Sequence, residues 1–165
     1  MKDRWISLYV ENDVGVLAKV AGLFAGKAYN LSSLTVGPTE DETMSRMTIK
    51  TICNDITFEQ IKKQLNRMVE VIKVIDLTDM QVHMKELMFA KIKNISAEEM
   101  NDIMQIAQVF TVDVVDISMD SLLLECKLTE RRNNDLIRLL RSRFKEIEIV
   151  RGGAVAIESI STSCR

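Results

Sequence analysis

Apolar and polar residues recur with two different periods along this chain, and the periods predict its elements. In the first half, short apolar or alternating stretches indicate strands, and spacings of three and four indicate amphipathic helices. The predicted strands are residues 5–10, 31–36, 45–53 and 71–77, and the predicted helices are 16–27 and 57–68. We expect Asn12 or Asp13 to cap the first helix, since a short side-chain oxygen can accept from free N–H groups there.

The second half repeats this order of elements. Strands are predicted at 86–92, 111–117, 122–128, 147–150 and 154–157, and helices at 97–110 and 129–144. The order strand, helix, strand, strand, helix, strand is that of the ferredoxin-like βαββαβ motif, an α+β fold. We therefore predict two such domains in tandem, residues 1–79 and 80–165, joined near residues 78–84. The tail 159–165 is expected to fray.

Composition narrows the class of protein. Hydrophobic residues make up 47% and charged residues 28% of the 165 residues, which is typical of a globular chain. The net charge of −2 gives no broad basic surface for nucleic acid. No apolar stretch approaches the ~20 residues that span a bilayer. The three cysteines are Cys53, Cys126 and Cys164, too scattered for a zinc site. We expect a cytoplasmic protein with neither nucleic-acid nor membrane partners.

Residues for ordinary catalysis or metal binding are scarce. The single histidine, His83, has no cysteine or aspartate beside it, so no metal site and no nucleophile–base pair is predicted. An enzyme on a ferredoxin-like scaffold is therefore disfavoured. An RNA-binding module of the same element order needs aromatic residues on its central strands. Neither 45–53 nor 122–128 contains one.

The segment between the first strand and the first helix is the most informative. It contains Asn12, Asp13 and Gly15 just before the helix. Unpaired N–H groups and the helix dipole at such a point favour an anion. Gly15 would either let a ligand approach the backbone or supply a positive φ. An α-amino acid needs N–H donors for its carboxylate, an amide oxygen for its ammonium and an apolar wall. A plain turn is the alternative from local chemistry alone.

A longer pattern follows this segment. Tyr29-Asn30 precedes the stretch SLTVGPTEDETMSRMTI at residues 33–49. Together with the loop, this pattern resembles the small, regulatory subunit of acetolactate (acetohydroxyacid) synthase, whose N-terminal half is an ACT domain. In the second half, the resemblance is carried by length, element order and the segment Glu86-Leu87-Met88.

The resemblance implies a regulatory role in branched-chain amino-acid biosynthesis. Such a subunit has no active site and no cofactor of its own. It binds a large catalytic subunit that uses thiamine diphosphate, magnesium and FAD, raises its activity and makes it sensitive to feedback inhibition by valine. A stand-alone tandem ACT sensor that acts on another target is the alternative.

The resemblance also implies where an effector binds. ACT domains of this kind pair side by side as a homodimer, with the effector at the interface between a loop of one protomer and Asn30 and Leu31 of the other. The implied site residues are Asn12, Asp13, Val14, Gly15, Val16, Leu17, Asn30, Leu31, Thr35 and Gly37. Two departures border this site. The family usually has glycine where this chain has Ala28, and commonly has Ile-Glu at Leu31-Ser32.

Overall fold

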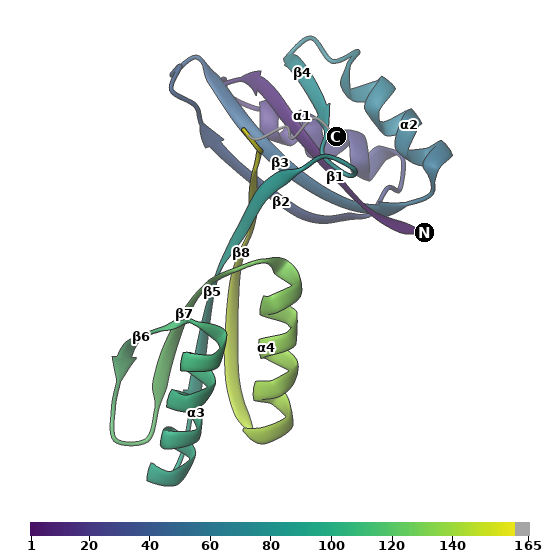
Figure 1. Cartoon of the computed structure of the whole chain (residues 1–165). Coiled ribbons are helices and arrows are strands. Elements are labelled where there is room, and N and C mark those ends of the chain that lie inside the picture. Colours follow the sequence, from purple (N-terminus) through teal and green to yellow (C-terminus); the bar gives the residue numbers. More distant parts are fainter. Residues whose placement is uncertain (161–165) are drawn as a thin grey trace. The chain divides into compact units, whose positions relative to one another are not determined.

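The computed structural model describes residues 1–160 and divides the chain into two compact units (Figure 1). The first unit contains Met1–His83 together with residues 155–160. The second unit is Met84–Ala154. The first unit is therefore discontinuous in sequence. The predicted limits of the two domains, 1–79 and 80–165, stay a prediction.

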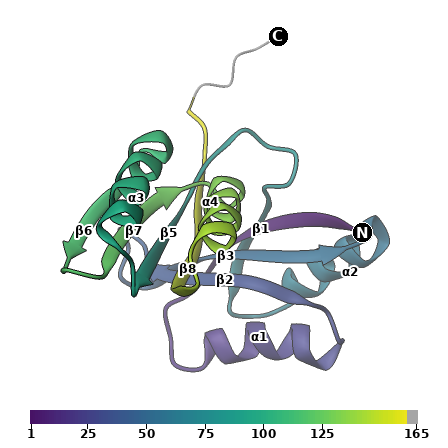
Figure 2. The same ribbon diagram turned by 90° about the horizontal axis from the view of Figure 1, so that it is seen from below.

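The first unit is a four-stranded antiparallel sheet with two helices. Its elements are β1 (Lys2–Glu11), α1 (Val16–Gly26), β2 (Leu31–Pro38), β3 (Met44–Cys53), α2 (Asp55–Leu65) and β4 (Val71–Asp76). The strand order is β2-β3-β1-β4. Figure 2 shows α1 below this sheet. Alternate residues of β1, such as Ile6 and Leu8, pack with Phe24 of α1 and Ile61 of α2 in one hydrophobic core. The opposite face of the sheet carries Trp5, Ser7 and Tyr9 of β1 and, paired with them, Lys50, Thr48 and Arg46 of β3.

The second unit has the same build. Its elements are β5 (Val82–Lys93), α3 (Ala97–Phe110), β6 (Asp113–Ile117), β7 (Leu122–Leu128), α4 (Glu130–Arg143) and β8 (Glu146–Glu158). The strand order is β6-β7-β5-β8. Figure 1 shows α3 and α4 on the same face of this sheet. Its core includes Met88, Ile103, Leu124 and Leu136, all fully buried. The predicted fold class, two ferredoxin-like domains in tandem, is confirmed.

The last strand differs from the prediction. Two short strands were expected at 147–150 and 154–157, but β8 runs without interruption from Glu146 to Glu158. The glycine pair Gly152-Gly153 breaks the apolar pattern without ending the strand, because Gly153 takes a φ of 82° that other residues resist. At the tail, the N–H of Ser159 donates to the carbonyl of Gln81 at 2.9 Å. The rest of the predicted frayed tail, 161–165, lies outside the described residues.

Candidate functional site

The start of α1 differs from the starts of the other three helices. Side-chain oxygens cap α2, α3 and α4, and the capping residues are Asn54, Ser96 and Thr129. The N-cap of α1 is Gly15, in the left-handed conformation with φ 85°, and no side chain caps the helix. The expectation that Asn12 or Asp13 caps α1 is therefore wrong. Gly15 takes the second of the two roles that the sequence left open.

The side chains of Asn12 and Asp13 are used within the loop instead. The oxygen of Asn12 accepts from the hydroxyl of Ser45 at 2.9 Å, and its Nδ2 donates to the carbonyl of Glu42 at 2.9 Å. Asp13 accepts from the N–H of the next residue, Val14, at 2.7 Å. These bonds fasten the β1–α1 loop to the β2–β3 hairpin and leave the helix start uncapped.

The uncapped turn presents free backbone donors. The first hydrogen bond of helical spacing runs from the N–H of Lys19 to the carbonyl of Gly15 at 3.0 Å. The N–H groups of Leu17 and Ala18 precede it, so the helix itself offers them no acceptor. They lie at the positive end of the helix dipole, which favours a carboxylate or another anion. A Cβ built on Gly15 meets nothing within 4 Å, so there is open space at this point.

The positive charge of Lys19 on this helix is already balanced by a neighbouring carboxylate. Lys19 forms an ion pair and hydrogen bond with Glu70, which raises the pKa of the lysine and lowers the pKa of the carboxyl. Attraction for an anion at the start of α1 therefore rests on the backbone groups rather than on this side chain.

The strand ladder decides which other predicted residues lie near this loop. Gly37 lies opposite Arg46 of β3, and Pro38 lies opposite Ser45, the residue that holds Asn12. The Gly37 end of β2 and residues 12–17 are therefore at one end of the sheet, with Thr35 two residues further along.

Asn30 and Leu31 are not brought to this place within one chain. They follow the C-terminal end of α1, and an 11-residue helix spans about 16 Å. Their side of the sheet is marked by the pairing of Leu31 with Thr51, at the far end of β3 from Arg46. A site that combines them with Gly15 needs a second copy of the chain.

The surface around the β1–α1 loop has features that favour contact with another chain. In the first sheet β2 is an edge strand. Beside it, Val14 is 96% exposed, and Leu17 and Val36 are nearly half exposed. An edge strand with free backbone groups next to apolar side chains is a template for pairing with another chain.

One charged residue of this region was not singled out from the sequence. Arg46 donates to the hydroxyls of Ser7 and Tyr9 at 2.8 and 3.0 Å, and to the carboxylate of Glu158 at 2.7 Å. A cavity of about 450 Å³ lies beside it, lined by residues that include Thr35, Gly37 and Ile157. The signal in the sequence was the position of Arg46 on the polar, helix-free face of β3, within the SRMTI pattern.

Other reactive groups are isolated. No group of three or more His, Cys, Asp or Glu residues that could hold a metal occurs within residues 1–160. His83 is exposed, while Cys53 and Cys126 are buried free thiols. Burial raises the pKa of the Cys126 thiol to about 11, which keeps it in the unreactive protonated form. Over the same residues, no helix is both long and apolar enough to cross a membrane.

Both halves of the chain match known protein families. Residues 6–73 match the family of AHAS small subunit-like ACT domains, and residues 85–160 match the family described as the small subunit of acetolactate synthase. The acetolactate synthase small subunit of Aquifex aeolicus is 40% identical over 152 residues, which cover 92% of this chain and 79% of that protein. The chain belongs to the acetolactate synthase small-subunit family.

Other members agree over nearly the whole length. The small subunit of acetolactate synthase isozyme 3 from Escherichia coli is 32% identical over 154 residues, 93% of this chain and 94% of that protein. The crystal structure of the acetolactate synthase small subunit from Thermotoga maritima superposes with a TM-score of 0.87 at 32% identity, covering 98% of this chain and all of that one. The family resemblance seen in the sequence is confirmed, and the uncapped start of α1 in this chain lies within residues 6–73, the segment that matches the ACT-domain family.

Proposed function

We propose that this chain is a cytoplasmic, non-catalytic regulatory subunit of acetolactate synthase. It activates the catalytic large subunit in branched-chain amino-acid biosynthesis and confers feedback inhibition by valine. Thiamine diphosphate, magnesium and FAD belong to the large subunit, and this chain has only an amino-acid effector. The observation that carries the proposal is the uncapped, glycine-initiated start of α1 within a family-matched ACT domain.

The effector's carboxylate binds at the start of α1. Its acceptors match the free N–H groups of Leu17 and Ala18, and the loop residues Val14 and Gly15 border it. Asn12 keeps one amide hydrogen and one lone pair beyond its bonds to Glu42 and Ser45, since an amide side chain has four hydrogen-bonding positions. These remaining positions face the polar end of the amino acid.

The site is completed by a second copy of the chain. Antiparallel pairing of β2 with its symmetry mate about Leu34 sets Leu31 of one copy opposite Gly37 of the other, and Asn30 opposite Pro38. The same pairing satisfies the edge of β2 and covers the apolar side chains of Leu17 and Val36. Those side chains, with Val14, supply the wall that suits an aliphatic effector.

Binding is tested by calorimetry of the purified chain with valine, leucine and isoleucine, comparing Gly15→Asp with Gly15→Asn. The two substituted side chains have nearly the same size and both tolerate a positive φ, so they differ chiefly in charge. Gly15→Asp should abolish valine binding, because its carboxylate competes for the same N–H groups. Gly15→Asn should retain measurable binding. Equal valine affinities in the two variants would show that the carboxylate of the effector does not bind at the start of α1.

The regulatory role is tested by reconstitution with the catalytic large subunit. Acetolactate formation should be absent with this chain alone, rise when it is added to the large subunit, and fall again with valine. A chain that binds valine but leaves the large subunit unchanged would favour the alternative, a stand-alone tandem ACT sensor with another target.

A further inference from the structure

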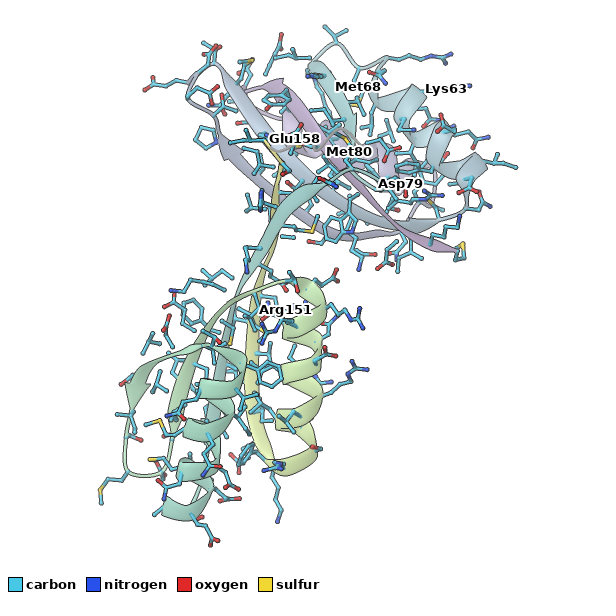
Figure 3. All side chains as sticks on the ribbon, viewed as in Figure 1. Lys63, Met68, Asp79, Met80, Arg151 and Glu158 are labelled. Atoms are coloured by element: carbon cyan, nitrogen blue, oxygen red, sulfur yellow. The ribbon has the colours of Figure 1, made fainter. Side chains whose placement is uncertain are left out.

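The strand β8 belongs to both compact units. Its residues up to Ala154 are in the second unit, and its residues from Val155 are in the first. Figure 3 labels Arg151 and Glu158 along this stretch. Within the first unit, the end of β8 is held by the ion pair of Glu158 with Arg46 at 2.7 Å and by the bond from Ser159 N–H to the Gln81 carbonyl.

The Arg46–Glu158 pair is more ordered than an ordinary surface ion pair. The two side chains are only 18% and 30% exposed. The guanidinium also donates hydrogen bonds to the hydroxyls of the fully buried Ser7 and of Tyr9. It lies over the ring of Tyr9, 5.0 Å from the ring centroid. Because the guanidinium of Arg46 is already held in place, it loses little conformational freedom when it pairs with the carboxylate of Glu158.

Arg46 lies one strand away from the proposed effector interface. On the β2–β3 ladder, Arg46 is directly opposite Gly37 and Thr48 is directly opposite Thr35. A shift of β2 on pairing or effector binding therefore moves the strand that holds Arg46. The cavity of about 450 Å³ beside the guanidinium is lined both by residues of β2, such as Thr35 and Gly37, and by Val155–Ile157 of β8. A displacement of β2 therefore changes the space between that strand and the end of β8.

We propose that the Arg46–Glu158 pair is a latch that couples effector occupancy at the β2 edge to the second unit through β8. This inference rests on the proposed effector function. The end of β8 is fastened in one effector state and released in the other, and the effector changes the balance by its different affinity for the two. The latch carries the signal without touching the effector.

The test is Glu158→Gln in the reconstituted holoenzyme, with Glu148→Gln as the matched control. Glu148 accepts from Lys93 at the same distance of 2.7 Å, but that pair is exposed and lies wholly in the second unit. Three quantities are measured: valine affinity of the chain by calorimetry, the valine concentration for half inhibition, and amide hydrogen exchange over Val155–Ser159.

Glu158→Gln should accelerate exchange over Val155–Ser159, make that exchange insensitive to valine, and weaken valine inhibition by at least about fivefold, the lower end of allosteric coupling. Because the effector prefers one latch state, the valine affinity of the chain should change by no more than about the same factor. Glu148→Gln should change none of the three. Glu158→Asp, which keeps the charge on a shorter arm, should restore part of the inhibition and guards against a loss through misfolding.

Two results would overturn the latch while leaving the effector site intact. One is a Glu158→Gln holoenzyme with unchanged valine inhibition. The other is a folded variant that no longer binds valine at all, which would make Glu158 a support of the effector site. If the unsubstituted chain binds none of the three amino acids, the proposed function fails, and the latch fails with it.

Discussion

The hydroxyl of Ser45 donates a 2.9 Å hydrogen bond to the side-chain oxygen of Asn12. This bond joins the β1–α1 loop to β3, and Ser45 itself is 5% exposed. The residue that the sequence marks as an effector ligand is therefore held in place by one that lies outside the predicted site.

Ser45→Ala should weaken valine binding by about threefold to tenfold, although Ser45 does not touch the proposed effector. The size follows from about 1 kcal/mol for one hydrogen bond, here used to order the Asn12 side chain. Calorimetry on the purified chain measures it. Ser142→Ala, which removes a hydroxyl from α4 in the second unit, serves as the control and should leave the affinity unchanged.

Ala28→Gly should stabilise the first unit by about 1 kcal/mol. Ala28 has a φ of 54°, in the left-handed region that favours glycine. Urea unfolding followed by the fluorescence of Trp5, the single tryptophan, reports on this unit. Ala25→Gly inside α1 is the matched control and should destabilise by about the same amount. Destabilisation by both variants would show that Ala28 is unstrained.

Glu86→Ala should destabilise the second unit by about 3 kcal/mol. Glu86 is 4% exposed and accepts two hydrogen bonds from Arg151 and one from the buried Asn133. Removing the carboxylate leaves a partly buried guanidinium and a buried amide without this acceptor, which is costly. Hydrogen exchange in β5 and α4 measures the loss. Lys93→Met, at an exposed pair, should cost less than about 1 kcal/mol.

Acid should weaken the hold on the end of β8. The hydrogen bond from Arg46 lowers the pKa of the Glu158 carboxyl below its ordinary value of 4.5. Because the folded pKa is the lower one, the stabilisation is complete above pH ~4.5 and disappears as the pH falls through the folded pKa. The difference in free energy of unfolding between the parent chain and Glu158→Gln, about 0.5 kcal/mol after solvent screening, should vanish over that range. A difference that persists at pH 3 would mean that the charge of Glu158 is not the cause.

The fold was predictable because its core residues are hydrophobic and recur with a strict period. Alternating residues such as Ile6 and Leu8 on β1, and the helical spacing of Phe58, Ile61 and Leu65 on α2, each indicate one buried face. The continuity of β8 was not predictable, since two adjacent glycines usually mark a turn and here Gly153 keeps the strand going.

The position of the candidate site was predictable from the sequence, but the hydrogen bonds of its side chains were not. Gly15 and the segment before α1 were identified from residue types. The roles of Asn12 and Asp13 were not, because both residue types cap helices as readily as they bond within loops. What decided between the two was Ser45, 33 residues away in sequence. The Arg46–Glu158 pair, 112 residues apart, was beyond any local pattern.

The discontinuity of the first unit affects how the protein folds during synthesis and how it should be truncated. As the chain leaves the ribosome, residues 1–83 emerge before the second unit, but their unit gains residues 155–160 only after the whole second unit has been synthesised. A fragment that stops before Val155 would lack Glu158, the carboxylate that pairs with Arg46 on the helix-free face of the first sheet. Expression of the ACT domain alone is therefore best attempted with residues 155–160 rejoined by a linker.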